Sequence, residues 1–376
     1  MAGLYIHVPF CEKRCIYCDF YSNTDQSYKT PYLKALIREM SLRKDYLKGE
    51  SLKTLYFGGG TPSQLTYTEL SSLFGAISQH YDLSKCEEIT LEANPDDMTP
   101  EYIALLRRLP INRISMGVQS FLDDDLAFLN RRHTSKQAVD AVHQCQDSGL
   151  TNLSIDLIYG LPGQTLQRWE QILDAAIALG VPHISAYHII YEEGTRLWKM
   201  VHSGTVKPVD EETSVALFEM LTQKLSAAGF LHYEISNFAK PGFESRHNSS
   251  YWTGEKYLGL GPSAHSFDGE CRDWNVASLP KYIKGIESGK PEMGHEELNA
   301  TEHYNETVFT GLRTLHGVNL SQLRMRFGDA MYLYCMEQAK PSIDAGLLIV
   351  DGDKMRLSHK AVFISDSIMS DLMKVD

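Results

Sequence analysis

Short apolar runs alternate with amphipathic helical patterns through the first half of this 376-residue chain. Each run is nearly continuous in apolar residues, as expected for a strand that is covered on both faces. A strand–helix–strand pattern repeated about six times requires right-handed crossovers, and therefore predicts a parallel sheet. The predicted strands are residues 4–8, 54–60, 88–94, 113–120, 153–160 and 183–190, and the predicted helices between them include 32–47, 68–81, 136–149 and 167–180.

Polar residues at the predicted strand ends narrow the choice of α/β architecture. An open (β/α)6 barrel and a doubly wound sheet both satisfy the alternation. The partial barrel is favoured because Gly58–Gly60 with Thr61, Glu92, Gln119 and Asp156 gather at one edge, where parallel α/β proteins place their chemistry. Asp156 lies inside the apolar run SIDLIYG, and a buried carboxylate needs a partner, which a cationic ligand would supply.

The pattern changes after residue 190. A helix near 211–228 precedes a β-rich run at 232–240 and a loop rich in glycine, serine, histidine and aromatic residues at 241–275. The last part is predicted to be a small winged-helix-like unit, whose elements are helices at 301–314, 319–327 and 365–374 and a hairpin that turns at Asp351-Gly352. The predicted domain division is therefore 1–230 for the core, 231–300 for a barrel extension and connecting loop, and 301–376 for the C-terminal domain.

Composition limits the partners and the compartment. The net charge of −12, from 36 basic and 48 acidic residues, argues against a broad phosphate-binding face and therefore against a nucleic-acid partner. No apolar run is long enough for a transmembrane helix, and the N-terminus lacks the basic and apolar regions of a secretory signal. Seven cysteines, four of them scattered singly, argue against a disulfide framework and fit the reducing cytoplasm.

Three cysteines stand close together near the N-terminus, in the pattern C-x3-C-x2-C at Cys11, Cys15 and Cys18. Three thiolates at this spacing can bind three irons of a four-iron cluster, which leaves the fourth iron open for another ligand. The alternative is structural zinc in a non-enzymatic scaffold, which requires a fourth ligand, for which His7 is a candidate. Metal analysis that found zinc and no sulfide would favour the scaffold.

With Tyr17 before its last cysteine, this motif resembles the signature of the radical SAM enzymes. The runs LYIHVPFC, FGGGTPS, LEANP, SMGVQSF and IDLIYGLPGQT, in order over about residues 4–165, together resemble the oxygen-independent coproporphyrinogen III oxidases and the haem chaperones related to them. The resemblance implies a partial (β/α)6 barrel of the radical SAM type, with a HemN-type domain over 301–376. It also implies a [4Fe–4S] cluster on the three cysteines and S-adenosylmethionine on the open iron, from which one-electron cleavage yields a 5′-deoxyadenosyl radical.

The same resemblance implies a set of cofactor-binding residues. Tyr5 would lie beside the bound cofactor, Tyr17 would stack on adenine, and Glu92 would hydrogen-bond S-adenosylmethionine. Gly59, Gly60 and Thr61 would contact its methionine end, and Gln119, Arg131 and Asp156 match positions that line a second S-adenosylmethionine in the oxidases. The residues alone favour a solvated helix charge for Arg131. For Asp156 the alternative is a buried acid paired with a neighbour, but its otherwise apolar strand favours a functional role.

Two departures from the oxidases favour the haem-chaperone branch. Phe20 stands where the oxidases have a fourth cysteine, and only ten residues precede Cys11. The run HNSSYW at 247–252 matches the H-N-x-x-Y-W pattern of the chaperones, which implies haem binding by His247, Asn248, Tyr251 and Trp252, with His265 as a further candidate. The alternative is a loop histidine with aromatic residues that plug the barrel mouth.

The resemblance therefore implies a cytoplasmic haem chaperone with haem as its cargo and acceptor haem proteins, such as respiratory enzymes, as its partners. The alternative function is oxidative decarboxylation of coproporphyrinogen III. The sequence leaves open whether the chain dimerises, associates peripherally with a membrane, binds a second S-adenosylmethionine or performs radical chemistry.

Overall fold

The computed structural model describes residues 2–375. It confirms the predicted alternation of strands and helices in the first half of the chain, with bounds that agree within a few residues. The strands of this half are β1 (Ala2–Val8), β2 (Leu52–Gly59), β3 (Glu88–Ala93), β4 (Arg113–Gln119), β5 (Leu153–Tyr159) and β6 (His183–His188). Each is parallel to the next, as crossover connections require.

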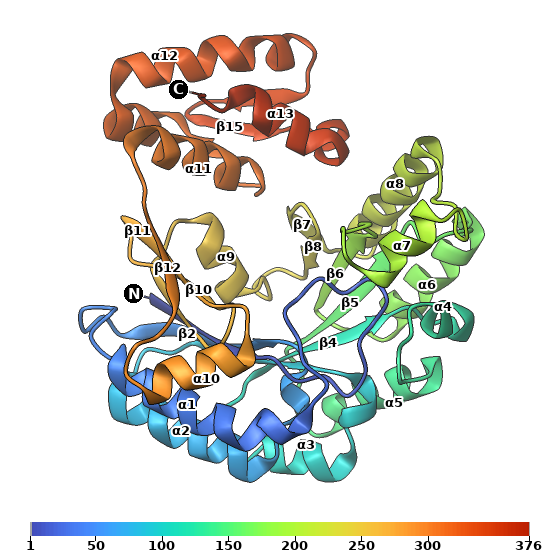
Figure 1. The fold of residues 1–376 in the computed structure, drawn as a ribbon. Helices are drawn as coiled ribbons and strands as arrows, with labels where there is room; N and C mark the ends of the chain where they lie inside the picture. Colours follow the sequence, from blue (N-terminus) through green and yellow to red (C-terminus); the bar gives the residue numbers. More distant parts are fainter. Residues whose placement is uncertain (1, 376) are drawn as a thin grey trace.

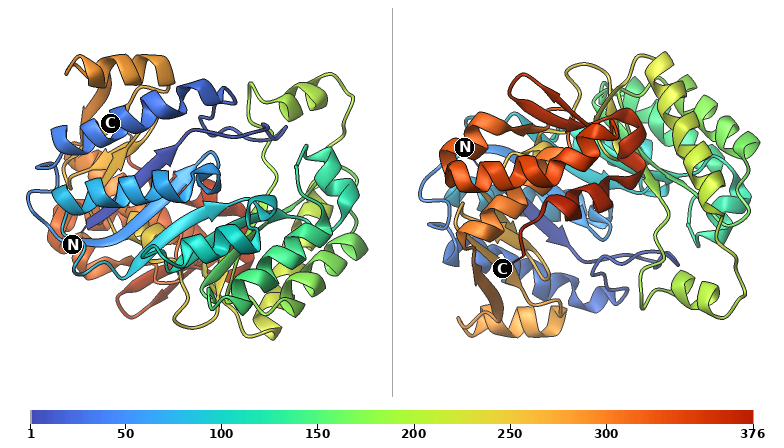
Figure 2. Two further views of the ribbon diagram at one scale, coloured as in Figure 1. Left: turned by 90° about the horizontal axis from the view of Figure 1, so that it is seen from below. Right: turned by 90° about the horizontal axis from the view of Figure 1, so that it is seen from above.

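Helices cover the outer, convex side of this sheet (Figure 1; Figure 2, left). They are α1 (Lys29–Leu42), α2 (Tyr67–His80), α3 (Pro100–Leu106), α5 (Ser135–Asp147), α6 (Leu166–Ala178) and α8 (Glu211–Ala227). The short helices α4 (Asp123–Phe128) and α7 (Arg196–His202) pack beside the cysteine loop instead. Local sequence sets their ends: Thr66 and Thr134 each form a capping box, and Gly149 and Gly180 adopt the positive φ of a helix C-terminus. Short 3-10 helices are η1 (Gln26–Tyr28), η2 (Pro62–Gln64), η3 (Pro95–Asp97) and η4 (His359–Ile364).

Additional strands extend the sheet at both edges. β7 (Leu231–Glu234) and β8 (Asn237–Ala239) join β6 in antiparallel pairing. On the other side, β9 (Tyr257–Leu260) pairs parallel to β1, and it is followed outward by β10 (His265–Phe267), β11 (Cys271–Asn275) and β12 (Met293–Glu297). The helices of this part are α9 (Arg246–Trp252) and α10 (Leu279–Glu287). The prediction of a loop over 241–275 is therefore wrong, because strands of three to five residues are too short to show a period.

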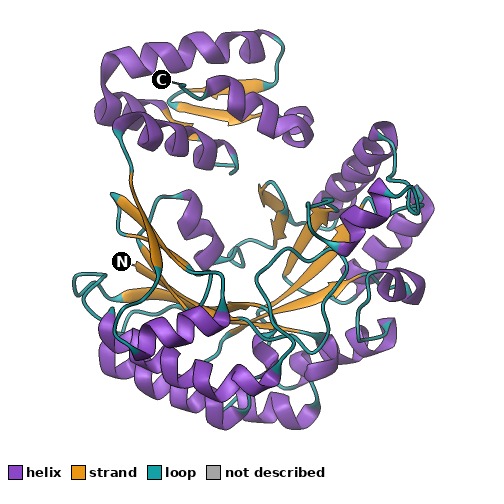
Figure 3. Ribbon diagram, viewed as in Figure 1, coloured by secondary structure: helices purple, strands orange, loops and turns teal. Residues whose placement is uncertain are grey.

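The sheet curves but does not close. Its order within residues 2–375 is β12-β11-β10-β9-β1-β2-β3-β4-β5-β6-β8-β7, so β12 and β7 remain its edges (Figure 3). This arrangement is the predicted partial barrel. A buried carboxylate holds the extension against the core: Glu39 of α1 accepts hydrogen bonds from Gly261 N, Asn275 Nδ2 and Tyr282 Oη at 2.6–2.8 Å.

The C-terminal part forms a smaller unit with its own apolar core (Figure 2, right). It contains α11 (Ala300–Leu312), β13 (Val318–Asn319), α12 (Leu320–Asp344), β14 (Leu348–Asp351), β15 (Lys354–Leu357) and α13 (Ser365–Leu372). The second predicted helix ends near Gly328, where φ is +82°, but the chain resumes a helix after this kink and continues to Asp344. The predicted hairpin is present, with Gly352-Asp353 as its two-residue loop, whereas the exact domain boundaries stay a prediction.

Within residues 2–375, none of the helices combines the length and the apolar character that crossing a membrane would require.

Candidate functional site

The loop that carries the three cysteines follows β1 and crosses the carboxyl ends of the parallel strands. Cys11 N donates to Asn23 O at 3.0 Å, which pins the start of the loop to its end. Ile16 N donates to Leu129 O at 3.3 Å, which joins the middle of the loop to the segment after α4. All three cysteines are free thiols; Cys11 is buried, and Cys15 and Cys18 are half-buried.

The spacing of the three sulfurs decides against a preformed zinc site. A tetrahedral zinc with bonds of about 2.3 Å brings its sulfur ligands to within about 3.8 Å of one another. Among the described residues, only Cys271, His295 and Glu297 form a group of three such ligand atoms within 4.8 Å of one another, so the N-terminal sulfurs lie further apart. A cluster, whose thiolates bind different irons, accommodates a wider spacing.

His7, the candidate fourth zinc ligand, has a structural role. Its Nε2 donates to Tyr21 O at 2.9 Å, and its Nδ1 hydrogen-bonds with the Tyr5 hydroxyl at 3.1 Å. Burial lowers the pKa of His7 to about 4, so the ring is neutral at physiological pH. Because both ring nitrogens are engaged, His7 provides no ligand atom to the cysteine loop in this conformation.

Two polar groups contact the sulfurs directly. Thr61 Oγ1 donates to Cys11 Sγ at 3.3 Å, and Arg131 Nη1 donates to Cys15 Sγ at 3.4 Å. Arg131 lies in the turn between α4 and α5, where it also donates to Asn94 Oδ1 at 2.7 Å and to Gly117 O at 2.6 Å. It is therefore not a solvated helix charge, because its guanidinium ties the cysteine loop to the ends of β3 and β4.

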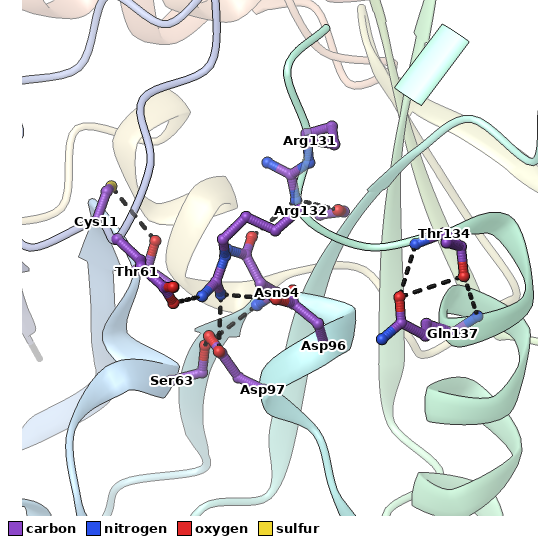
Figure 4. A network of polar contacts seen from close by, with 12 residues as sticks. Cys11, Thr61, Ser63, Asn94, Asp96, Asp97, Arg131, Arg132, Thr134 and Gln137 are labelled. Carbon is purple, nitrogen blue, oxygen red and sulfur yellow. Dashed lines mark hydrogen bonds and ion pairs between the residues drawn. The ribbon is translucent and has the colours of Figure 1, made fainter. Parts of the chain in front are cut away.

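Arg132 adds a second tie between the same loops (Figure 4). It forms ion pairs with Asp97 at 2.7 Å, with Asp96 at 3.1 Å and with Glu12 of the cysteine loop. Ser63, which follows β2, donates to Asp97 at 2.6 Å. The ends of β2 and β3 and the cysteine loop are therefore cross-linked by charge-assisted hydrogen bonds, which hold the thiols in place.

A cavity of about 410 Å³ lies under the cysteine loop. Most of the cofactor-binding residues expected from the sequence line it: Tyr17, Gly59, Gly60, Thr61, Glu92, Gln119, Arg131 and Asp156, together with Cys11, Cys15 and Cys18. Tyr5 is not among the lining residues, because its hydroxyl hydrogen-bonds His7 and its ring stacks on Tyr56 with centroids 6.1 Å apart.

The glycines at the end of β2 are required by packing. A Cβ on Gly59, whose φ is +103°, would lie 2.5 Å from the His7 ring. A Cβ on Gly60 would lie 2.8 Å from the carbonyl oxygens of Val8 and Phe10. The close approach of the glycine run is therefore to β1 and the start of the cysteine loop, and its predicted contact with a cofactor stays a prediction.

Two carboxyl groups face the cavity. Glu92 accepts from the Tyr56 hydroxyl at 2.8 Å and from Gly59 N at 3.1 Å, and burial with the nearby charge of Asp156 raises its pKa to about 7. Burial raises the pKa of Asp156 to about 6, although hydrogen bonding to Ser185 opposes the shift. A cationic ligand would favour the ionised form of both acids.

Sequence reasoning missed several polar residues of the cavity wall. They alternate along three strands and are Arg113 and Ser115 on β4, Ser154 on β5, and His183, Ser185 and Tyr187 on β6. Between them stand buried apolar residues, such as Ile114 and Met116, which pack under the helices. This alternation with period two was visible in RISMGVQ and in LSIDLIY, and it indicates one polar face and one apolar face.

The haem-binding candidates do not lie together. Asn248 lines the first cavity, whereas Tyr251 and Trp252 line a second cavity of about 970 Å³. His265 is exposed on β10 and stacks on Trp274 with centroids 5.9 Å apart, outside both cavities. The residues of α9 therefore line two different cavities.

His247, in the first turn of α9, is buried against β2. Its Nδ1 lies 2.8 Å from Thr54 Oγ1, and its Nε2 lies 2.9 Å from the Tyr251 hydroxyl. The ring stacks on Tyr56 with centroids 4.9 Å apart, and burial lowers its pKa to about 3. Both ring nitrogens are therefore occupied, and iron ligation by His247 would require it to leave these partners.

Comparison with known proteins gives matches over the whole chain. The model of the radical SAM superfamily matches residues 5–176, and that of the HemN C-terminal domain matches residues 298–364. Proteins named "Heme chaperone HemW" are similar: that of Bacillus subtilis (strain 168) is 35% identical over 98% of both chains, and that of Mycobacterium tuberculosis is 36% identical over 99% of this chain and 94% of its own. In structure, the coproporphyrinogen III oxidase HemN of Escherichia coli matches 99% of this chain and 90% of its own, with a TM-score of 0.86 and 22% identity.

Proposed function

The chain belongs to the HemW family of the radical SAM superfamily, and on this premise we propose that it is a haem chaperone that carries a [4Fe–4S] cluster and binds S-adenosylmethionine. In this proposal it takes up haem and passes it to acceptor haem proteins, such as respiratory enzymes. The full-length similarity to proteins named as haem chaperones supports the haem part, and the superfamily supports the cluster and S-adenosylmethionine.

The observation that carries the cofactor part is the joint lining of the first cavity. Three free thiols stand at one wall, and the carboxyl groups of Glu92 and Asp156 stand at another. S-adenosylmethionine bears a sulfonium and an ammonium group, so two partly protonated acids are suitable partners for it. When bound, the cluster supplies an iron with an open coordination position.

The residues of the chain have separate roles in this proposal. Cys11, Cys15 and Cys18 would ligate iron, which requires their thiols to lose protons. Burial raises the pKa of Cys18 to about 11, so the free chain holds this thiol protonated and metal binding releases the proton. Thr61 and Arg131 would orient the sulfurs through the hydrogen bonds that they donate.

Anaerobic reconstitution tests the cofactor part. The expected result is four irons and four sulfides per chain, with an absorption spectrum that changes when S-adenosylmethionine is added. The variant with Cys11, Cys15 and Cys18 all replaced by serine should hold no cluster, whereas Cys86→Ser should hold a full one. Wild-type protein with one zinc and no sulfide would instead support the metal-stapled scaffold.

Titration with haem tests the cargo part. A chaperone should bind one haem per chain and release it to an apo-acceptor, which is followed by the transfer of the Soret band between the two proteins. Wild-type protein that binds no haem under oxygen-free conditions would overturn this part of the proposal, whatever its cluster content.

A second candidate function is oxidative decarboxylation of coproporphyrinogen III, which the close fold match to HemN favours. Phe20, at the position where the oxidases have a fourth cysteine, is 67% exposed and lines the mouth of the first cavity. Anaerobic turnover of coproporphyrinogen III, followed by product fluorescence, separates the two functions, and the haem-chaperone proposal expects none. A cytoplasmic location and the lack of a nucleic-acid partner stay predictions, and dimerisation and peripheral membrane association remain open.

A further inference from the structure

The second cavity lies between the sheet extension and the C-terminal unit. Its volume of about 970 Å³ is at the upper end of the range of about 300–1,000 Å³ that is typical of small-molecule sites. One wall comes from α9 and from β9 to β11, and the other comes from α11, the turn after it and the start of α12. A ligand here would contact both parts of the chain.

The walls suit a flat aromatic ligand with an apolar surface. Trp252, Tyr257, Phe309 and Phe327 line the space, and aromatic rings of this kind stack on planar ligands. The indole Nε1 of Trp252 is a buried donor that makes no hydrogen bond with any described residue. The rings of these four residues, in one cavity wall, favour a planar and apolar occupant.

The rim of the cavity is also apolar. Leu231 is 41% exposed and Leu315 is 51% exposed, and both residues line the cavity. Leu315 N donates to Tyr233 O at 3.0 Å, which links the turn after α11 to β7. Exposed leucines that flank an aromatic cavity indicate the entrance for an apolar molecule.

Histidines of the C-terminal unit reach the same space. His303 of α11 accepts a hydrogen bond at Nδ1 from Arg326 at 3.4 Å, which occupies the lone pair of this nitrogen. His316, in the turn between α11 and β13, is exposed, and neither of its ring nitrogens forms a hydrogen bond with another described residue. Of the two, His316 has a lone pair available for a metal.

Positive charge is available beside these rings. Arg326 lines the cavity and has no carboxylate partner within ion-pair distance among residues 2–375. Arg272, on the facing wall, is paired with Glu306 at 2.6 Å. An unpaired guanidinium at the edge of an aromatic cavity suits a ligand that carries carboxylates at one end.

We propose that the haem of this protein is bound in the second cavity, with His316 as the axial ligand of its iron, the aromatic wall against its face and Arg326 at its propionates. This inference rests on the proposed haem-chaperone function and adds the place and the ligand. The cargo then lies between the radical SAM core and the C-terminal unit, apart from the cavity of the cysteines. In this arrangement His247 is a positioning residue, because its Nε2 fixes the hydroxyl of Tyr251 in the cavity wall.

Haem titration of the reconstituted full chain tests the proposal. His316→Ala should weaken haem binding at least about tenfold and remove the spectral signature of imidazole ligation. His303→Ala is the matched control from the same cavity and should keep the spectral signature of imidazole ligation. Thr310→Trp, which fills the space from α11, should lower the haem stoichiometry while the iron and sulfide of the cluster stay unchanged.

The outcomes distinguish a failure of the proposed haem-chaperone function from a failure of the proposed haem site. If wild-type protein binds no haem, the proposed function fails, and this inference fails with it. If wild-type protein binds haem and both His316→Ala and Thr310→Trp bind it with unchanged affinity and spectrum, the function stands and the location is wrong. If His247→Ala removes the imidazole signature while His316→Ala retains it, the ligand is His247 and the inference is overturned. Weaker binding by His247→Ala with the signature retained supports its positioning role.

Discussion

The guanidinium of Arg131 donates a hydrogen bond from Nη1 to the Sγ of Cys15 across 3.4 Å. The two residues are 116 positions apart in the chain, and within residues 2–375 no other hydrogen bond joins an arginine or lysine to a sulfur of the cysteine loop. Arg131 therefore positions the sulfur of the second cysteine through a hydrogen bond from a distant part of the chain.

Replacement of Arg131 by alanine should lower the cluster content of anaerobically reconstituted protein. The change removes the donor to Cys15 and leaves Asn94 Oδ1 and Gly117 O without it, which should also lower the free energy of unfolding by about 1–3 kcal/mol. Iron and sulfide analysis and urea denaturation measure the two effects. The control is Lys136→Ala, which removes only a surface ion pair with Asp140, and equal cluster content in both variants would contradict this role.

The sequence predicts the strands and helices around the site well, but it does not predict the hydrogen bonds between the side chains of the site. The parallel strands and the outer helices follow from local patterns, because each needs only an apolar face and a cap. The cysteines and the expected cofactor-binding residues other than Tyr5 come from sequence motifs and line the first cavity, whereas the polar residues of β4 to β6 were missed. The contacts of Arg131 could not be predicted in this way. Its partners Cys15, Asn94 and Gly117 come from separate parts of the chain, which only the complete fold brings together.

The second cavity could not be predicted from the sequence, because its walls come from segments that are far apart in the chain and that mostly carry no recognisable pattern. Strands β9 to β11 are too short to show a period, and His316 lies in a turn that belongs to no motif. The HNSSYW run did mark the region, since Tyr251 and Trp252 reach this cavity. The histidine of this run, His247, forms a hydrogen bond with Thr54, a contact that no local sequence pattern could predict.

Replacement of Gly59 by alanine should destabilise the protein through a clash with His7. The new Cβ would lie 2.5 Å from the imidazole at a backbone φ of +103°, so both sterics and backbone strain act. Gly163 provides the control, since it has a φ of +73° but no atom within 4 Å of the Cβ position. Gly163→Ala should lower the free energy of unfolding by about 1 kcal/mol from backbone strain, and Gly59→Ala by several. Equal losses in urea denaturation would show that His7 moves aside without cost.

His247 should make stability depend on pH in the acidic range. Its folded pKa of about 3 lies below the value of about 6.5 for an unfolded histidine, so the unfolded chain binds the extra proton between these values. Stability is therefore fully present above pH 6.5 and is lost as the pH falls toward 3, by about 1.4 kcal/mol per pH unit for this residue. The free energy of unfolding of the cluster-free chain, measured by urea denaturation between pH 7 and 5, should fall less steeply with decreasing pH for His247→Gln than for wild type. Equal pH dependence in the two proteins would show that the buried ring of His247 can take up a proton in the folded state.

Replacement of Glu92 by glutamine should weaken the binding of S-adenosylmethionine about tenfold and leave haem binding unchanged. The amide oxygen can accept from Gly59 N and the amide NH2 can donate to the Tyr56 hydroxyl oxygen, but the side chain lacks the charge that a sulfonium or ammonium would contact. Because burial raises the pKa of Glu92 to about 7, wild-type affinity should rise with pH through this value, and the variant should not. Calorimetric titration of the cluster-loaded proteins measures both, and a similar pH dependence in the variant would assign it to Asp156.

Removal of the cluster ligands should leave haem binding intact, because the two cavities share no lining residue. The variant with Cys11, Cys15 and Cys18 replaced by serine should bind one haem per chain with the affinity and Soret band of the wild type, while it contains neither iron nor sulfide before haem is added. Conversely, His316→Ala should retain the full cluster and lose the imidazole signature. These opposite losses can occur only if the cofactor and the cargo occupy separate sites. Loss of haem binding in the serine variant, with an unchanged urea denaturation midpoint, would instead place the haem against the cysteine loop.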